Sequence, residues 1–244
     1  MPTVLITGGA RRLGAAFATA FAARGYDVGI TYRTSASAAA ATVDACAAAG
    51  VQAAMRHCDV ADAAALELAV TSLIDELGTP DVIVSNAGIF PDRTSVDRLQ
   101  VDAVRHAIDV NTLPLVTLAK VYHDCLVTSS VPHGRLISIS SLGALEIWRD
   151  RLAYNVSKSA LLTTVMSLAR SAAPRMSVNS VAPGAILMPH EPTSNDAAML
   201  PADRIPMGRH GSADDVMDAV WFFATCSPYV TGQVLTVDGG SHLS

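Results

Sequence analysis

Short apolar runs alternate with longer alanine-rich segments along the whole chain. The apolar runs are hydrophobic at successive positions, which is typical of strands buried on both faces of a parallel sheet. The longer segments have the spacing and the terminal glycines of helices. This pattern predicts strands over 4–7, 27–32, 51–58, 82–85, 136–140, 176–181 and 234–237, and helices over 13–24, 35–49, 61–77, 152–172 and 212–224.

Two further segments are less regular. Residues 96–128 are predicted to form one long helix or two joined pieces. The stretch 184–211 is rich in proline and too long for a simple connection, so we expect it to form a lid over a substrate. An ordinary surface excursion is the alternative for this stretch.

The alternation of strands and helices with short turns predicts the fold class. We expect an α/β, Rossmann-like, doubly wound parallel sheet of about seven strands with helices on both faces. The sequence contains no repeat and no linker long enough to separate domains. Residues 1–244 are therefore expected to form a single domain.

Composition narrows the classes of partner. The chain has 17 basic and 22 acidic residues and a net charge of −5, which gives no reason to expect a nucleic-acid partner. No apolar window reaches the roughly 18–20 residues of a membrane span, and the first residues lack the features of a secretion signal. The four cysteines are far apart, so we expect reduced thiols, no metal site and a cytoplasmic location.

A glycine-rich turn separates the first predicted strand from the first helix, with the sequence Thr7-Gly8-Gly9-Ala10-Arg11-Arg12-Leu13-Gly14. A helix N-terminus offers free N–H groups and the positive end of the helix dipole, which suit a pyrophosphate. Gly8 and Gly14 supply the backbone freedom and the close approach that a phosphate turn needs. The turn predicts a dinucleotide cofactor, and a tight packing turn without a ligand is the alternative.

The end of the second strand indicates which nicotinamide cofactor binds. Proteins that use NAD typically have an acid here for the ribose hydroxyls, whereas this strand ends in Tyr32-Arg33-Thr34-Ser35. Arg33 can form a forked, charge-assisted contact with a 2′-phosphate, and the two hydroxyls after it can add donors. We therefore expect NADPH (NADP+). A solvated surface arginine is the other interpretation of Arg33.

The next two strand ends extend the same cofactor site. Asp59 and Val60 follow the third strand, where a side-chain acceptor can meet the adenine amine. Asn86, Ala87 and Gly88 follow the fourth strand, and the small residues let a cofactor lie across the sheet edge. A structural role, tying neighbouring strands together, is the alternative for Asn86.

Candidate catalytic residues occur in the second half of the chain. Tyr154 and Lys158 are four positions apart in a strong helix pattern, so both project from one face. A nearby ammonium lowers the pKa of a phenol, which makes it a usable proton donor for an alkoxide. Ser141 ends the fifth strand, and the carboxyl ends of parallel strands face the ligand crevice. Its hydroxyl is expected to hold the substrate oxygen or nitrogen, with strand capping as the alternative.

In its ordered motifs the whole chain resembles a short-chain dehydrogenase/reductase. The landmarks of that family span the sequence in order: the turn at 7–14, Asn86-Ala87-Gly88, Asn111, Ser141, Tyr154 with Lys158, Pro183-Gly184, and Val237-Asp238-Gly239-Gly240. The resemblance implies an NADP-dependent oxidoreductase that acts on a small molecule. It also implies a homotetramer assembled through the long helices near Asn111 and Tyr154.

The same resemblance implies the role of each catalytic residue. Tyr154 is implied to be the general acid/base, and Lys158 to bind the nicotinamide ribose and lower the pKa of Tyr154. Ser141 is implied to orient the substrate, and Asn111 to hold a proton-relay water. Residues 183–188 are implied to pass near the nicotinamide, although Met188 stands where the family commonly has Thr. The expected cofactor contacts are Gly8, Arg11, Arg12, Leu13, Gly14, Tyr32, Arg33, Thr34, Asp59, Val60, Asn86, Ala87, Gly88, Tyr154, Lys158, Pro183, Gly184 and Ile186.

The residue type at position 12 indicates a class of substrate. Most of the family has Gly at this position, whereas a subset similar to pteridine reductases has Arg in a TGxxxRxG turn. Arg12 is expected to hydrogen-bond to a polar heterocycle, and Phe90 to stack a flat pterin against the nicotinamide, with a hydrophobic plug as the alternative for Phe90. Ser141 argues the other way, because pteridine reductases usually have Asp there.

We therefore expect a pterin-like substrate (a dihydropteridine or dihydrofolate compound) that binds at Arg12, Phe90, Ser141 and Tyr154. Reduction of a 3-oxoacyl thioester or another ketone is the alternative reaction. An NADPH-binding regulator without turnover is the alternative from another functional class, and the intact Ser141, Tyr154 and Lys158 argue against it.

Overall fold

The computed structural model describes residues 1–188, 191 and 199–243. Within that part of the chain, seven parallel strands form one sheet in the order β3-β2-β1-β4-β5-β6-β7. The chain builds outward from β1 to β3, returns to the other side of β1 with β4, and continues outward to β7. The strands are β1 (Thr3–Ile6), β2 (Asp27–Tyr32), β3 (Ala53–His57), β4 (Val82–Ser85), β5 (Gly134–Ile139), β6 (Met176–Pro183) and β7 (Val234–Val237).

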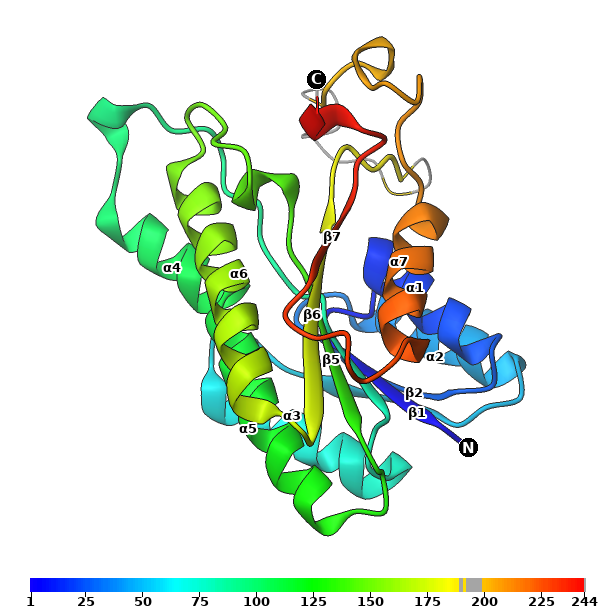
Figure 1. Ribbon diagram of the computed structural model, residues 1–244. Coiled ribbons are helices and arrows are strands. Elements are labelled where there is room, and N and C mark those ends of the chain that lie inside the picture. Colours follow the sequence, from blue (N-terminus) through cyan, green and yellow to red (C-terminus); the bar gives the residue numbers. More distant parts are fainter. Residues whose placement is uncertain (189–190, 192–198, 244) are drawn as a thin grey trace.

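Helices cover both faces of the sheet (Figure 1). One face carries α1 (Arg12–Ala22), α2 (Ala36–Ala48) and α7 (Ala213–Thr225). The other carries α3 (Ala63–Leu77), α4 (Val101–Asn111), α5 (Leu113–Thr128) and α6 (Leu152–Ala172). The predicted doubly wound α/β fold is therefore confirmed. The short 3-10 turns, which the sequence pattern did not predict, are η1 (Val96–Arg98), η2 (Leu142–Ala144), η4 (Ala202–Arg204) and η5 (Ser241–Leu243).

Two hydrophobic cores lie on opposite sides of the sheet. Val4 and Ile6 of β1 pack into the core under α1, α2 and α7, while Leu5 between them packs into the core under α3 to α6. Successive side chains of a strand point to opposite faces, so a strand covered on both sides is apolar at every position. This is the physical reason for the unbroken apolar runs in the sequence.

The segment 96–128 forms two helices rather than one. Thr112 lies between α4 and α5 with φ −120° and ψ −56°, outside helical geometry. Pro114 has no backbone N–H to donate to the preceding turn, so the helical hydrogen bonding breaks here. The interruption places Asn111 at the end of α4.

The apolar residues of α6 divide between the core and the surface. Leu161, Leu162 and Val165 are buried within the chain, whereas Met166 is 52% exposed. Of the predicted lid at 184–211, residues 189–190 and 192–198 lie outside the described residues. In its described part, Ile186 forms an isolated bridge with Gly211.

Cys46, Cys58, Cys125 and Cys226 all lie within the described residues and are free thiols. Burial raises the pKa of both Cys46 and Cys58 to about 11. Among the described helices, none is long and apolar enough to cross a membrane.

Candidate active site

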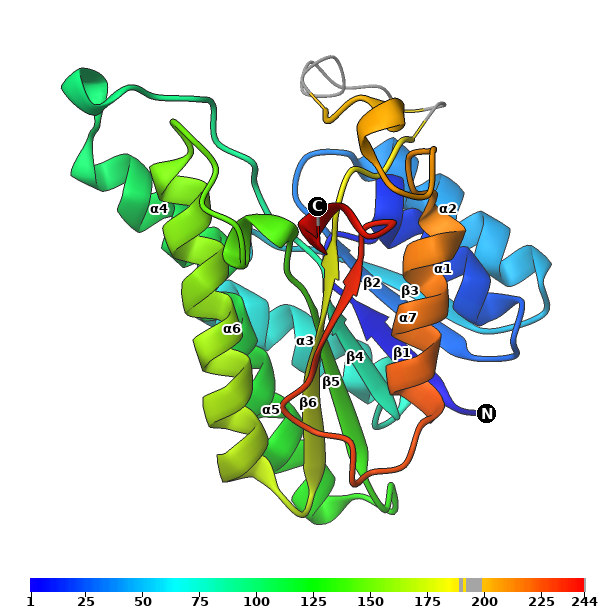
Figure 2. The same ribbon diagram turned by 45° about the horizontal axis from the view of Figure 1, so that its top comes forward.

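The predicted functional residues gather at one edge of the sheet. All seven strands run in the same direction, so their carboxyl ends meet at the edge near the C-terminus of the chain, opposite the N-terminus (Figure 2). The turn after β1, the Asn86–Gly88 segment after β4, Ser141 after β5 and Gly184 after β6 therefore all lie at this edge. Ligands of open α/β sheets bind at this edge, near the point where the strand order reverses.

The turn after β1 is tightly packed around two glycines. Gly8 adopts φ +65°, in the left-handed region that favours glycine. A Cβ atom on Gly14 would lie 2.1 Å from the Gly8 carbonyl oxygen. Asn86 Nδ2 donates to the Thr7 carbonyl at 3.0 Å and to the Gly8 carbonyl at 3.2 Å. Asn86 thus ties the turn to the end of β4, and a contact with the cofactor stays a prediction.

Glu191 contacts this same turn, although no motif in the sequence points to this contact. Its carboxylate accepts from Arg11 Nε at 2.9 Å and from the Arg12 backbone N–H at 3.0 Å. The Arg12 guanidinium donates to the Glu191 carbonyl, and Arg12 has φ +51°. Although burial raises the pKa of Glu191, these hydrogen bonds hold it below its usual value. A carboxylate at the start of α1 is consistent with an anion site at this helix N-terminus.

A cavity of about 400 Å³ extends from this turn across the ends of β2, β3 and β4. Arg33 and Asp59 both line it, and Arg33 Nη1 lies 3.6 Å from Asp59 Oδ2. Its lining includes most of the expected cofactor contacts: Gly8, Arg11, Arg12, Leu13, Gly14, Tyr32, Arg33, Thr34, Asp59, Val60, Asn86, Ala87 and Gly88. The remaining expected contacts, Tyr154, Lys158, Pro183, Gly184 and Ile186, are not part of this lining.

Tyr154 and Lys158 lie one turn apart near the start of α6, and both are buried. Lys158 Nζ donates to the Ile139 carbonyl at 2.9 Å and lies 6.0 Å from the centroid of the Tyr154 ring. Burial lowers the pKa of Lys158 to about 8. Burial also raises the pKa of Tyr154 to about 12. The pKa of Tyr154 is thus raised overall, because desolvation of the phenolate outweighs the hydrogen bond from Ser141 and the positive charge of Arg151. The expected lowering of this pKa by Lys158 stays a prediction.

Ser141 meets Tyr154 as expected. Ser141 is buried, its Oγ accepts from the Gly143 N–H at 3.1 Å, and it begins the η2 turn. A hydrogen bond between the Ser141 and Tyr154 side chains partly offsets the effect of burial on the pKa of Tyr154. The η2 turn also packs against the Tyr154 ring, since a Cβ atom on Gly143 would lie 2.9 Å from Tyr154 Cε1.

Asn111 joins three segments of the chain. Its Oδ1 accepts from the Ile89 N–H at 2.7 Å, and its Nδ2 donates to the Ile89 carbonyl and to Ser157 Oγ, both at 3.0 Å. The side chain therefore connects the end of α4, the loop after β4 and the first turn of α6. Its proton-relay role stays a prediction.

Phe90 lies beside Tyr154 rather than standing free to stack on a ligand. The two ring centroids are 4.5 Å apart and the rings are nearly perpendicular. Trp148 was not among the residues predicted from the sequence. Its ring stacks on the Tyr154 ring, with the two centroids 5.9 Å apart and an interplanar angle of 16°. The tyrosine is therefore enclosed by aromatic side chains from two different loops.

The last two landmarks contact one another. The Gly184 N–H donates to the Val237 carbonyl at 2.9 Å, and a Cβ atom on Gly184 would lie 2.7 Å from Asp238 Cβ. Asp238 accepts from Ser241 Oγ and from the backbone N–H of His242. The C-terminal segment is thereby fastened against the end of β6.

Comparisons with known proteins agree with this geometry. A family model described as enoyl-(acyl carrier protein) reductase matches residues 8–242. A 3-oxoacyl-[acyl-carrier-protein] reductase of Synechocystis sp. is 31% identical over 97% of this chain and 95% of that protein. A 3beta-hydroxysteroid dehydrogenase of Eggerthella lenta is 33% identical over 99% of this chain and 94% of that protein.

A solved structure extends the likeness to three dimensions. A short-chain dehydrogenase from Burkholderia cenocepacia, in complex with NADP, has a TM-score of 0.88 and is 33% identical, covering 99% of this chain and 98% of that chain. Family match, curated relatives and fold thus agree over nearly the whole length. The chain belongs to the short-chain dehydrogenase/reductase family of oxidoreductases.

Proposed function

We propose that this protein is an NADPH-dependent reductase that transfers a hydride to a small ketone, with 3-oxoacyl thioesters as the leading substrate class. The observation that carries the proposal is that Ser141 and Tyr154, both buried, meet at the carboxyl edge of the sheet, where the η2 turn that begins at Ser141 packs against the Tyr154 ring. A hydrogen-bond donor that holds a carbonyl oxygen beside a proton donor is the arrangement that carbonyl reduction requires.

The cavity beside the glycine-rich turn fits a dinucleotide. The turn can close tightly only because Gly8 and Gly14 lack a Cβ atom, which would collide with neighbouring atoms of the protein. A tight glycine turn of this kind leaves the start of α1 open to a pyrophosphate. At the far end of the same cavity, Arg33, Thr34 and Ser35 offer a guanidinium and two hydroxyls to a 2′-phosphate. NADPH, when bound, supplies the hydride. These residues support NADPH over NADH.

The chain's own residues supply the proton and hold the substrate. Ser141 donates a hydrogen bond to the carbonyl oxygen, and Tyr154 gives its proton to that oxygen as negative charge develops there. A phenol whose pKa is raised to about 12 is fully protonated at neutral pH, which suits a proton donor. Lys158 holds the nicotinamide ribose hydroxyls, and Asn111 connects Tyr154's helix to a proton-relay water.

A ketone is favoured over a pterin by two observations. Ser141 stands where pteridine reductases usually have Asp, and the Phe90 ring is packed against Tyr154. The named relatives include a 3-oxoacyl-[acyl-carrier-protein] reductase, and none of those reported above is a pteridine reductase. A pterin-like substrate is the second candidate, because Arg12 lines the cavity.

We further propose a single-domain, cytoplasmic protein that assembles as a homotetramer. Apolar side chains on the outer surfaces of α5 and α6 support the assembly: Leu113 is 48% exposed, Val116 47% and Met166 52%. Burial of such side chains against a second copy is favourable by about 25 cal/mol per Å² of apolar surface. Sedimentation velocity at micromolar concentration tests this assembly.

The substrate proposal is tested by NADPH oxidation measured with acetoacetyl thioester and with dihydrobiopterin, each repeated with NADH. We expect turnover of the thioester with NADPH and much weaker turnover with NADH. Turnover of dihydrobiopterin alone would favour the second candidate. Tight NADPH binding with no oxidation on a broad substrate panel would instead indicate a regulator without turnover.

A further inference from the structure

Arg151 is a charged residue buried at the catalytic end of α6. It directly precedes that helix, three positions before Tyr154, and only 6% of its surface is exposed. Burying a guanidinium is costly unless the protein provides specific contacts for it. We therefore expect specific contacts between the Arg151 guanidinium and neighbouring groups of the protein.

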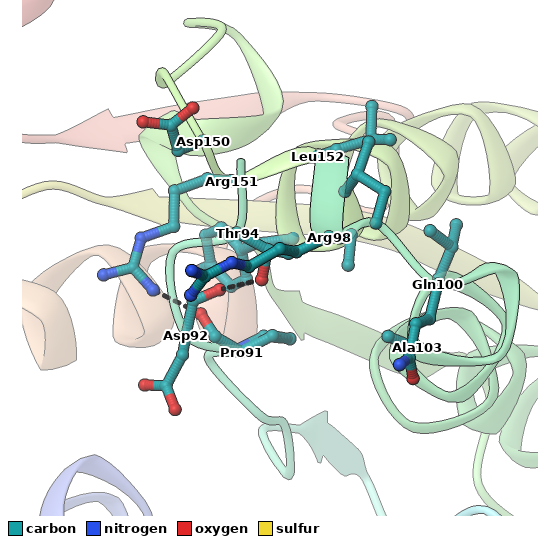
Figure 3. A pocket seen from close by; sticks show the side chains of 13 residues that line it. Pro91, Asp92, Thr94, Arg98, Gln100, Ala103, Asp150, Arg151 and Leu152 are labelled. Atoms are coloured by element: carbon teal, nitrogen blue, oxygen red, sulfur yellow. Dashed lines mark hydrogen bonds between the residues drawn. The ribbon is translucent and has the colours of Figure 1, made fainter. Parts of the chain in front are cut away.

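The Arg151 side chain contacts the loop after β4. Its guanidinium lies over the Phe90 ring, 4.1 Å from the ring centroid, and its Nη1 donates to the Pro91 carbonyl. Figure 3 shows the side chain extended toward Pro91, along the wall of a cavity of about 200 Å³ that Tyr154 also lines. The Thr94 N–H donates to the Asp150 carbonyl at 2.8 Å, a second link between the same two segments.

The Phe90 ring lies between Arg151 and the Tyr154 phenol and contacts both. One ring contacts the Arg151 guanidinium at 4.1 Å and the Tyr154 ring at 4.5 Å. Trp148 stacks on Tyr154 as well, at 5.9 Å. The angle of the phenol is therefore set by packed aromatic neighbours, and the guanidinium holds one of these neighbours in place by cation–π attraction.

Several charged groups surround this arrangement. On α6, Lys158 lies 6.0 Å from the centroid of the Tyr154 ring. From the loop after β4, Asp92 and Arg93 act on Arg151 with opposite sign. From the loop after β5, Glu146 accepts from Trp148 Nε1 at 3.0 Å. Burial raises the pKa of Tyr154, and the positive charge of Arg151 opposes that rise.

We propose that Arg151 is a positioning residue for the reaction: it fixes the Tyr154 ring through Phe90 and keeps a buried positive charge near the phenol. This inference rests on the proposed function, in which Tyr154 exchanges a proton with the substrate oxygen. A purely structural arginine would affect folding, whereas a positioning residue also changes how Tyr154 titrates during turnover.

The test measures kcat and the pH profile of kcat/KM for oxidation of a 3-hydroxyacyl thioester with NADP+. In this direction the Tyr154 phenolate accepts the proton, and because the pKa of this phenol is raised to about 12, activity rises with pH over the whole range of the assay. Arg151→Met removes the charge and is expected to shift the rising limb to higher pH by roughly half a pH unit or more and to lower kcat by roughly tenfold. Arg151→Lys keeps the charge and is expected to keep the limb near its wild-type position while losing part of kcat, because the planar stacking on Phe90 is lost.

Two further variants separate the effect of the orientation of the Tyr154 ring from the effect of an exposed charge on the same loop. Phe90→Leu leaves Arg151 in place but removes the shared ring, so we expect a lower kcat with little movement of the limb. Arg149→Met is the matched control, because the Arg149 side chain is 95% exposed on the same loop and should change neither quantity. If Arg151→Met does not fold, Arg151→Lys and Phe90→Leu still test the proposal through kcat.

The proposal is overturned if soluble Arg151→Met has the wild-type limb and kcat, or if Arg151→Lys and Phe90→Leu both retain the wild-type kcat. Tyr154→Phe belongs in the same series. Full activity in Tyr154→Phe would refute the proposed function itself, whereas an inactive Tyr154→Phe beside unchanged Arg151 variants would refute only the positioning role.

Discussion

Lys158 follows Tyr154 by one turn of α6, and its Nζ atom lies 6.0 Å from the centroid of the phenol ring. Both side chains are buried, and burial changes their pKa values in opposite directions: that of Lys158 falls to about 8, and that of Tyr154 rises to about 12. Each shift favours the neutral form of the side chain. Desolvation is therefore the main cause of both shifts, and for Tyr154 the Ser141 hydrogen bond and the Arg151 charge oppose it.

The low pKa of Lys158 predicts a specific dependence of stability on pH. Between pH 8 and the ordinary pKa of 10.5, the unfolded chain keeps a proton that the folded chain has lost. The free energy of unfolding should therefore rise with pH across this interval, by up to about 3 kcal/mol from this residue. Urea unfolding of wild type and Lys158→Met at several pH values measures the contribution, which the variant should lack. Lys120→Met, at an exposed position, is the control; the same pH dependence in wild type and Lys158→Met would contradict the assignment.

Arg33 is predicted to distinguish NADPH from NADH. Loss of a charge-assisted contact with the 2′-phosphate should weaken NADPH binding by roughly 10- to 100-fold in Arg33→Ala and leave NADH binding nearly unchanged. Fluorescence titration with both cofactors measures the two dissociation constants. Asp59→Asn removes the carboxylate 3.6 Å from Arg33 and should not weaken NADPH binding. Equal losses for both cofactors in Arg33→Ala would show that the 2′-phosphate lies elsewhere.

The Arg12 side chain is predicted to contribute more to the reduction of a pterin than to the reduction of a ketone. It has φ +51°, so Arg12→Gly relieves backbone strain of about 1 kcal/mol and removes a guanidinium that contacts Glu191. If ketones are the substrates, this variant should retain most of its activity on acetoacetyl thioester. Any pterin reduction should fall further than ketone reduction. Steady-state kinetics on both compounds decide the matter, and a loss confined to the ketone would contradict the account.

Much of the fold follows from the sequence because the signals are local. Strands such as β1 and β4 carry three successive apolar residues, and glycines mark several helix ends, so the element order and sheet type could be predicted. The break between α4 and α5 was left open, since Pro114 is compatible with a kinked helix as well as with two helices. The Gly8–Gly14 turn and the Tyr154/Lys158 spacing are also local, and a cavity lined by most of the expected cofactor contacts lies beside the turn.

The remaining features of the site depend on contacts between distant segments. Glu191 meets Arg12 across 179 positions of sequence, and Arg151 meets Pro91 across 60. The raised pKa of Tyr154 depends on how deeply folding buries the phenol, which a YxxxK spacing does not specify. Phe90 was correctly placed near the site, but its packing partner is Tyr154 itself.

Proton donation by Tyr154 is tested most directly by comparing wild type and Tyr154→Phe in NADPH oxidation with acetoacetyl thioester, with the dissociation constant for NADPH measured in parallel. The phenylalanine keeps the ring that packs against Phe90 and Trp148 and removes only the hydroxyl. We expect kcat to fall by roughly 10²- to 10⁴-fold while NADPH binds as tightly as before. Wild-type turnover in Tyr154→Phe would contradict the assignment of Tyr154 as the proton donor.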